Sequence, residues 1–133
     1  MVERLSRSIK AMPLFWTDSI VLSCSDVNAA KQWWVTAFDC KEVAVPPDWD
    51  EPLPSDVALK LPGSDVPTVL LSSHSEGRES SEHPIIFTGK VKKAHEHLRG
   101  RGIVTGPIRE EYGTEIFEVT DPEGNAIEIC NEP

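Results

Sequence analysis

EIFEVTDPEGNAIEIC, residues 115–130, is the stretch that decides the fold of this chain. Two runs in which apolar and polar residues alternate flank the four residues Asp121-Pro122-Glu123-Gly124. Aspartate at the first position, proline at the second and glycine at the fourth suit a type I turn. The stretch therefore predicts a β-hairpin near the end of the sequence.

The alternation separates the side chains of this hairpin into two faces, because successive residues of a strand point to opposite sides. One face is apolar and should pack on the core: Phe117, Val119, Ile127 and Ile129. The other face carries Glu118, Thr120, Glu128 and Cys130. Two carboxylates on one strand pair are more than a purely structural hairpin needs, so this face is a candidate functional surface.

The composition bounds the class of protein. The 133 residues suffice for one domain with its own core, and we expect a single domain over 1–133. A net charge of −9 argues against a nucleic-acid partner, because phosphate binding needs a basic surface. No apolar run is long enough for a membrane span, so we expect no membrane partner. Three cysteines without a CxxC pair favour a reducing compartment, and we expect a cytoplasmic protein.

Upstream of the hairpin, apolar periodicity predicts the remaining elements. Residues 1–12 should form a tail or a short helix. A proline-rich loop at 46–54 and a serine-rich linker at 72–82 interrupt the pattern. The predicted strands lie at 19–24, 40–45, 57–61, 68–72 and 84–88 and near Ile103, and the predicted helices at 28–38 and 91–99.

The pattern repeats. An offset of 64 residues maps Ser19 onto His83, and an offset of 58 maps Leu70 onto Glu128. The difference falls in the proline-rich loop, where an insertion costs little. We therefore predict two βαβββ modules, at about 17–72 and about 83–130, joined by the linker.

The repeat, together with particular residues, resembles the vicinal oxygen chelate superfamily, which includes glyoxalase I, bleomycin-binding proteins, fosfomycin-resistance enzymes and extradiol dioxygenases. The residues that carry the resemblance are Asp26-Val27, Trp33-Trp34, and Asp121 to Asn125 with Glu128. It covers roughly 17–130. The resemblance implies an α+β fold in which the two modules form an incompletely closed eight-stranded barrel, a cup with helices outside.

In that family a divalent metal sits in the cup on four equivalent positions, which the repeat places here at Ser19, Leu70, His83 and Glu128. An imidazole and a carboxylate are good ligands, so His83 and Glu128 are the candidate metal ligands. Serine is at best a weak ligand and leucine is none. The resemblance thus implies a possible divalent metal of unknown identity with an incomplete ligand set.

Other residues are candidates for contacts with a substrate. Glu118 shares its face with Glu128 and is the candidate general base, unless it forms an ion pair with Lys60, its equivalent in the first module. Trp49, in the proline-rich loop, is a candidate stacking platform for a ligand or a dimer contact. The predicted substrate contacts are Trp49, Lys60, Phe87 and Cys130.

Two functions remain open at this point, with a third behind them. The protein is either a divalent-metal lyase or isomerase of the glyoxalase type, or a metal-free protein that binds a small molecule, like the bleomycin-binding branch. The third is an interaction module with a vestigial cup. The two missing metal ligands favour a binding protein, whereas the presence of both His83 and Glu128 favours an enzyme. We expect a homodimer, whose cup forms within one chain or by exchange of modules.

Overall fold

The computed structural model describes residues 13–49 and 52–131. The tail or short helix expected at 1–12 lies outside the described residues. Among the described helices, none has the length and apolar character that a membrane crossing requires.

The first module is a four-stranded sheet with one helix. Its strands lie in the order β1-β4-β3-β2, and β1 and β4 run parallel. Asp26 starts the helix as its N-cap, because its side chain accepts a hydrogen bond from the backbone N–H of Ala29 at 3.0 Å. The elements are β1 (Ile20–Cys24), α2 (Val27–Phe38), β2 (Lys41–Val43), β3 (Val57–Lys60) and β4 (Val69–Ser73).

The second module repeats this topology, which confirms the predicted repeat. Its strands lie in the order β5-β9-β8-β6, with β5 and β9 parallel. The elements are β5 (Ile85–Thr88), α3 (Val91–Gly100), β6 (Val104–Thr105), β7 (Arg109–Glu111), β8 (Thr114–Thr120) and β9 (Ala126–Asn131). Strand β7, which pairs with β8, was not predicted: its residues Arg-Glu-Glu are all charged and exposed, so they carry no alternation.

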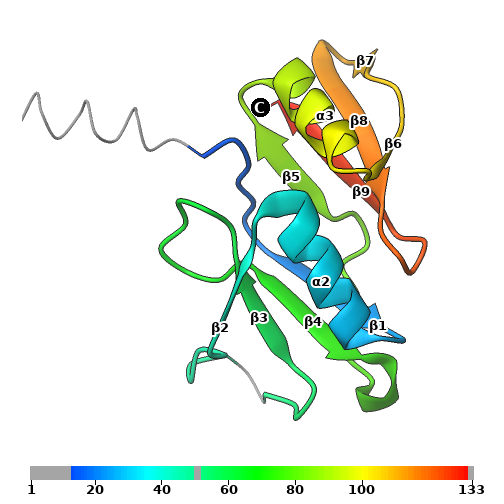
Figure 1. Cartoon of the computed structure of the whole chain (residues 1–133). Coiled ribbons are helices and arrows are strands. Elements are labelled where there is room, and N and C mark those ends of the chain that lie inside the picture. Colours follow the sequence, from blue (N-terminus) through cyan, green and yellow to red (C-terminus); the bar gives the residue numbers. More distant parts are fainter. Residues whose placement is uncertain (1–12, 50–51, 132–133) are drawn as a thin grey trace, which may run out of the picture.

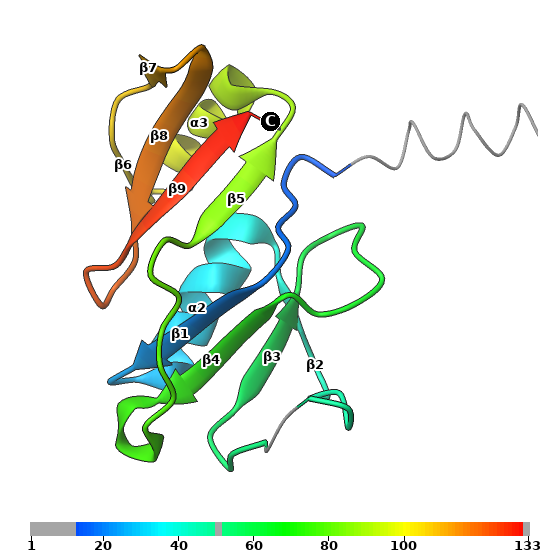
Figure 2. The ribbon, with the colours of Figure 1, turned by 180° about the vertical axis from the view of Figure 1, so that it is seen from behind.

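The two helices cover the same side of the two sheets (Figure 1). Seen from behind, the other sides of both sheets face the viewer without a helix over them (Figure 2). We call these sides the open faces. The sheets do not close into a barrel, in agreement with the expected incomplete cup. The core lies between sheets and helices, where Trp34, Phe38, Phe117, Ile127 and Ile129 are at most 1% exposed.

The closing hairpin forms as predicted. Its core face is fully buried, and Glu118 and Glu128 lie directly opposite each other on the open face. The buried carboxylate of Asp121 organises the turn, because it accepts hydrogen bonds from the backbone N–H of Glu123 at 3.0 Å and of Asn125 at 2.8 Å. Gly124 has a φ of +87°, a conformation that glycine adopts without a steric penalty.

The serine-rich segment predicted as a linker is ordered against the first sheet. Its first two residues, Ser72 and Ser73, belong to β4, and the 3-10 helix η1 (His74–Glu76) follows. The hydroxyls of Ser80 and Ser81 then accept hydrogen bonds from the backbone N–H groups of Ser23 and Val21, at 2.8 and 2.9 Å. Side-chain bonds of this kind leave no periodic signal, so the segment was indistinguishable from a loose linker in the sequence.

The second module holds both ends of α2. At the N-terminal end, the Glu123 carboxylate accepts from the backbone N–H of Ser25 at 2.8 Å. At the C-terminal end, the Arg101 guanidinium donates to the carbonyl oxygen of Thr36 at 2.9 Å and to Asp39 at 2.7 Å. A negative group at the start and a positive group at the end of a helix both complement its dipole. The modules therefore pack as one unit within the chain.

Candidate functional site

A cavity lies on the open face of the first sheet, and we call it cavity one. Its volume is about 450 Å³. Val21 of β1 and Leu70 of β4 supply apolar surface, and half-buried Trp49 comes from the proline-rich loop. The full lining is Ser19, Ile20, Val21, Asp48, Trp49, Asp56, Thr68, Leu70 and Arg78. The predicted ligand contact at Trp49 thus lines a cavity of a size suited to a small molecule.

A partly buried ion pair forms one wall of cavity one. The guanidinium of Arg78 donates to Asp56 Oδ2 at 2.7 Å and to Oδ1 at 3.3 Å. The Asp56 side chain is only 2% exposed and also accepts from the backbone N–H of Leu53 at 2.8 Å. Because the carboxylate has both a charged partner and a backbone donor, this wall is a fixed polar surface.

Ser55 and Glu76 tie the end of the loop to β4 and η1. The backbone N–H of Ser55 donates to Glu76 Oε1 at 2.8 Å, and the Ser55 hydroxyl bonds to the same oxygen. The Ser55 hydroxyl also accepts from the backbone N–H of Ser73 at 2.9 Å. The loop that carries Trp49 is therefore anchored where it enters β3.

A smaller, acidic cavity of about 210 Å³ lies beside the second sheet, and we call it cavity two. It brings together three predicted site residues, His83, Glu118 and Glu128, with Glu82 close by in the chain. Glu118 and Glu128 face each other across β8 and β9, and like charges in that position destabilise a strand pair. A cation in cavity two would relieve this repulsion.

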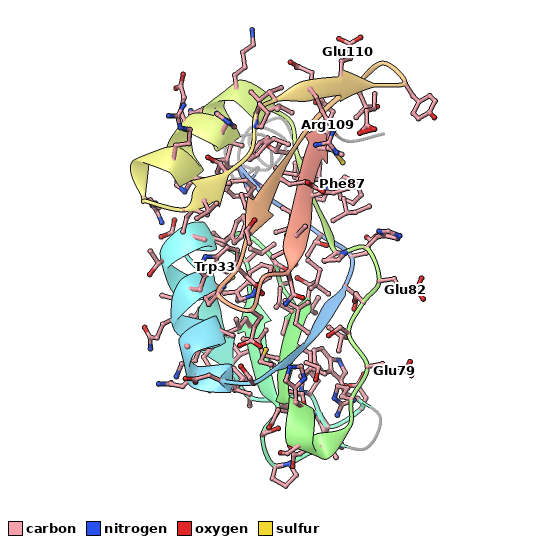
Figure 3. The ribbon with its side chains drawn as sticks, turned by 90° about the vertical axis from the view of Figure 1, so that its right-hand side faces the viewer. Trp33, Glu79, Glu82, Phe87, Arg109 and Glu110 are labelled. Atoms are coloured by element: carbon pink, nitrogen blue, oxygen red, sulfur yellow. The ribbon has the colours of Figure 1, made fainter. Side chains whose placement is uncertain are left out.

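Three predicted substrate contacts line neither of these cavities. Lys60 forms no ion pair with Glu118, since no nitrogen–oxygen contact within 4.0 Å joins these two described residues. Phe87 is half-buried and packs near Trp16, with ring centroids 6.4 Å apart (Figure 3 shows it pointing away from the helices). Cys130 is 8% exposed, and burial, followed by the nearby Glu128 charge, raises the pKa of its thiol.

The four positions expected to surround a metal are divided between the two cavities. Ser19 and Leu70 line cavity one, whereas His83 and Glu128 line cavity two. Within residues 13–49 and 52–131, no group of three or more His, Cys, Asp or Glu side chains converges as a metal site would require. The donor set within these described residues of one chain therefore does not fit a bound metal ion.

Sequence reasoning missed three charged residues of cavity one: Asp48, Asp56 and Arg78. Asp48 precedes Trp49 in the proline-rich loop, and this adjacency was an available signal. Arg78 is the one basic residue between Ser72 and Glu82 apart from His74. Its role depends on the return of that segment over β1, which the sequence pattern does not report. Glu82, at the end of the same segment, projects outward in Figure 3.

Comparison with known proteins found a family model that matches most of the chain. The family model described as Glyoxalase/Bleomycin resistance protein/Dioxygenase superfamily matches residues 16–129. No curated protein matches the chain in sequence.

Solved structures of similar fold cover nearly the whole chain. A member of the glyoxalase/bleomycin resistance protein/dioxygenase superfamily from Sphaerobacter thermophilus DSM 20745 superimposes with a TM-score of 0.67 and 22% identity, over 88% of this chain and 97% of that chain. TnmS3, an antibiotic binding protein from Streptomyces sp. CB03234, has a TM-score of 0.66 and 17% identity, over 89% and 96%. Lactoylglutathione lyase from Agrobacterium tumefaciens has a TM-score of 0.66 and 16% identity, over 87% and 92%. At these identities the likeness concerns the fold alone.

Proposed function

Since this chain belongs to the glyoxalase/bleomycin resistance protein/dioxygenase superfamily, we propose that it is a protein that binds a small molecule on its open faces. Cavity one is the observation that carries the proposal. Its volume of about 450 Å³ falls within the range of small-molecule sites, and it combines apolar surface with fixed polar groups. The three free, buried thiols suit a reducing compartment, so we place the protein in the cytoplasm.

The lining of cavity one favours a cationic ligand with an aromatic ring. Trp49 offers a flat surface for stacking, and a positive charge over its ring gains cation–π attraction. Asp48 adds a carboxylate to the same wall, and the net charge of −9 attracts cations over a longer range. The antibiotic-binding protein of the same fold makes antibiotics a sensible first panel of ligands.

Fluorescence titration tests this function. Cationic aromatic drugs and metabolites should quench the tryptophan fluorescence of the wild-type protein, and most of that change should vanish in Trp49→Phe. Trp16→Phe, which removes a tryptophan outside cavity one, is the matched control. In calorimetry, Trp49→Ala should weaken binding by about tenfold, the loss of roughly one stacking contact. No binding across the panel, or binding unaffected by Trp49→Ala, would contradict the proposal.

We further propose a homodimer in which each cup combines cavity one of one chain with cavity two of the other. Three observations support it. The two cavities share no lining residue, and contacts at both ends of α2 hold the two modules of one chain as a unit. The open faces also carry half-buried apolar side chains, Val21, Ile85 and Phe87, which a second copy would cover. Light scattering with size-exclusion chromatography should give twice the mass of one chain.

A metal-dependent lyase of the glyoxalase type is the second candidate function. The observation in its favour is that His83, Glu118 and Glu128 all line cavity two, although within the described residues of one chain they do not converge as a metal site. Elemental analysis after purification without a chelator, followed by calorimetry with Ni²⁺, Zn²⁺ and Mn²⁺, tests it. Metal binding that is lost in both His83→Ala and Glu128→Ala would support this function. If the wild-type protein neither retains nor binds a divalent ion, small-molecule binding remains the proposed function.

A further inference from the structure

A serine, a histidine and a glutamate from three distant parts of the chain meet outside both cavities. Ser23 lies in β1, His74 in η1, and Glu123 in the turn between β8 and β9. The Ser23 hydroxyl is 2.7 Å from His74 Nδ1. The other ring nitrogen of His74, Nε2, is 3.6 Å from Glu123 Oε1. The imidazole thus stands between a hydroxyl and a carboxylate, an arrangement that recurs in nucleophilic serine sites.

The carboxylate of this group is held ionised. The backbone N–H and the hydroxyl of Ser25 donate to its two oxygens, each at 2.8 Å. These donors, with the backbone hydrogen bond of Ser25 as the largest influence, hold the pKa of Glu123 below its ordinary value. A negative charge beside Nε2 favours the tautomer that carries its proton there. Nδ1 is then free to accept the proton of the Ser23 hydroxyl.

Ser23 faces the same side as the proposed ligand site. Side chains alternate along β1, where Ile20, Leu22 and Cys24 are buried in the core. Ser23 therefore points to the open face together with Val21, which lines cavity one two residues earlier. The His74 side chain is 57% exposed, so water reaches the pair.

We propose that Ser23 is a nucleophile that accepts the acyl group of activated esters, with His74 as its general base and Glu123 as the positioning residue for His74. The Ser23 oxygen bonds to the ester carbonyl carbon, and its proton passes to His74 Nδ1. The bond from that carbon to the leaving oxygen breaks, and the departing alcohol takes the proton. Water, deprotonated by the same imidazole, then releases the acid and restores Ser23. This site is separate from cavity one and does not depend on the binding function.

Labelling with a fluorophosphonate tests the nucleophile directly, because the serine oxygen displaces fluoride from phosphorus and leaves a stable adduct. Mass mapping of the wild-type protein should find the adduct on Ser23. His74→Ala should label at least about 100-fold more slowly, the usual contribution of a general base, and added imidazole should restore part of the rate. Ser75→Ala, beside His74 but outside the group, should label like the wild type.

The role of Glu123 has its own measurement. Salt should slow the labelling of the wild-type protein, because it screens the contact between imidazole and carboxylate. Glu123→Gln should be labelled more slowly than the wild type, and its labelling rate should not change with salt. A folded wild-type protein without an adduct on Ser23 would overturn the proposal. A labelling rate that is unchanged in His74→Ala would also overturn it. The same holds if His74→Ala is folded by circular dichroism and added imidazole restores none of its labelling rate. Binding to cavity one is measured separately and survives either result.

Discussion

Tyr112 has a backbone conformation that a residue with a bulky side chain rarely adopts. It occupies the two-residue loop between β7 and β8 with Gly113, and their φ angles are +52° and +78°. Two positive φ angles are typical of a type I′ turn, in which asparagine followed by glycine is preferred. The tyrosine side chain is fully exposed, so no buried contact offsets the strain.

Replacement of Tyr112 by asparagine should therefore stabilise the protein. Asparagine tolerates a positive φ better than tyrosine, and we expect a gain of about 0.5–1 kcal/mol in the free energy of unfolding. Urea denaturation followed by circular dichroism measures the change. Tyr112→Phe, which keeps the strain, is the control and should leave stability unchanged. A loss of stability in Tyr112→Asn would show that the tyrosine ring makes a contact.

The cysteines are predicted to be inert in the folded protein. Burial raises the pKa of Cys24 to about 11 and that of Cys40 to about 12, and Cys130 shifts in the same direction. Because the thiolate is the reactive form, a disulfide reagent at pH 8 should modify none of them within minutes. All three should react at once in denaturant. Rapid modification of a folded thiol would indicate that its surroundings open.

At the scale of elements, the closing hairpin does more than complete its own sheet. Its turn supplies Glu123, which bonds to the chain just before α2 in the other module. Alternation and turn residues predicted the hairpin, because both are local properties of the sequence. The contact with α2 joins residues 98 positions apart and has no local signature. For the same reason the sequence predicted Trp49 as a ligand contact but gave no signal for Arg78, which lines the same cavity. It also could not show that His83 and Ser19 lie in different cavities.

The contact between Glu123 and α2 should depend on pH. Folding lowers the pKa of Glu123. The ionised carboxylate therefore stabilises the fold above the pKa of the unfolded chain, about 4.3, and this stabilisation is lost as the pH falls through the pKa of the folded protein. Glu123→Gln should cost about 1 kcal/mol at pH 7, and the difference from the wild type should shrink below about pH 4. Glu79→Gln, an exposed residue of the linker, controls for the charge change (Figure 3). If the difference in stability between Glu123→Gln and the wild type stays constant down to pH 3, the ionised Glu123 carboxylate is not its source.

At the scale of the whole molecule, mixing two variants tests the proposed dimer, because each cup would combine cavity one of one chain with cavity two of the other. In the proposed dimer, Trp49→Ala damages both cups through cavity one, and Glu128→Ala damages both through cavity two. A mixed dimer of the two variants contains one cup with both changes and one cup with neither. Ligand binding should therefore return, to one site per dimer, after the two variants are unfolded and refolded together.

Cups formed within one chain would behave differently. Each cup of the mixed dimer would then carry one damaged half, and binding would not return. Wild-type protein taken through the same refolding is the control for recovery. This result would correct the assembly and leave the binding function of cavity one in place.

The separation of the two sheets also has a consequence for the order of folding. Within the described residues, each sheet is built from strands of its own module, apart from one β-bridge between Trp16 and Phe87. All the strand pairings of the first sheet are therefore available once synthesis has passed Ser73. The outer edge of β1, on the side away from β4, is then still a template on which another chain could add a strand. The hydroxyls of Ser80 and Ser81 reach that edge within the next eight residues, long before β9 exists. We therefore expect the serine-rich segment to cover this edge of β1 during synthesis and so to reduce aggregation of the incomplete chain.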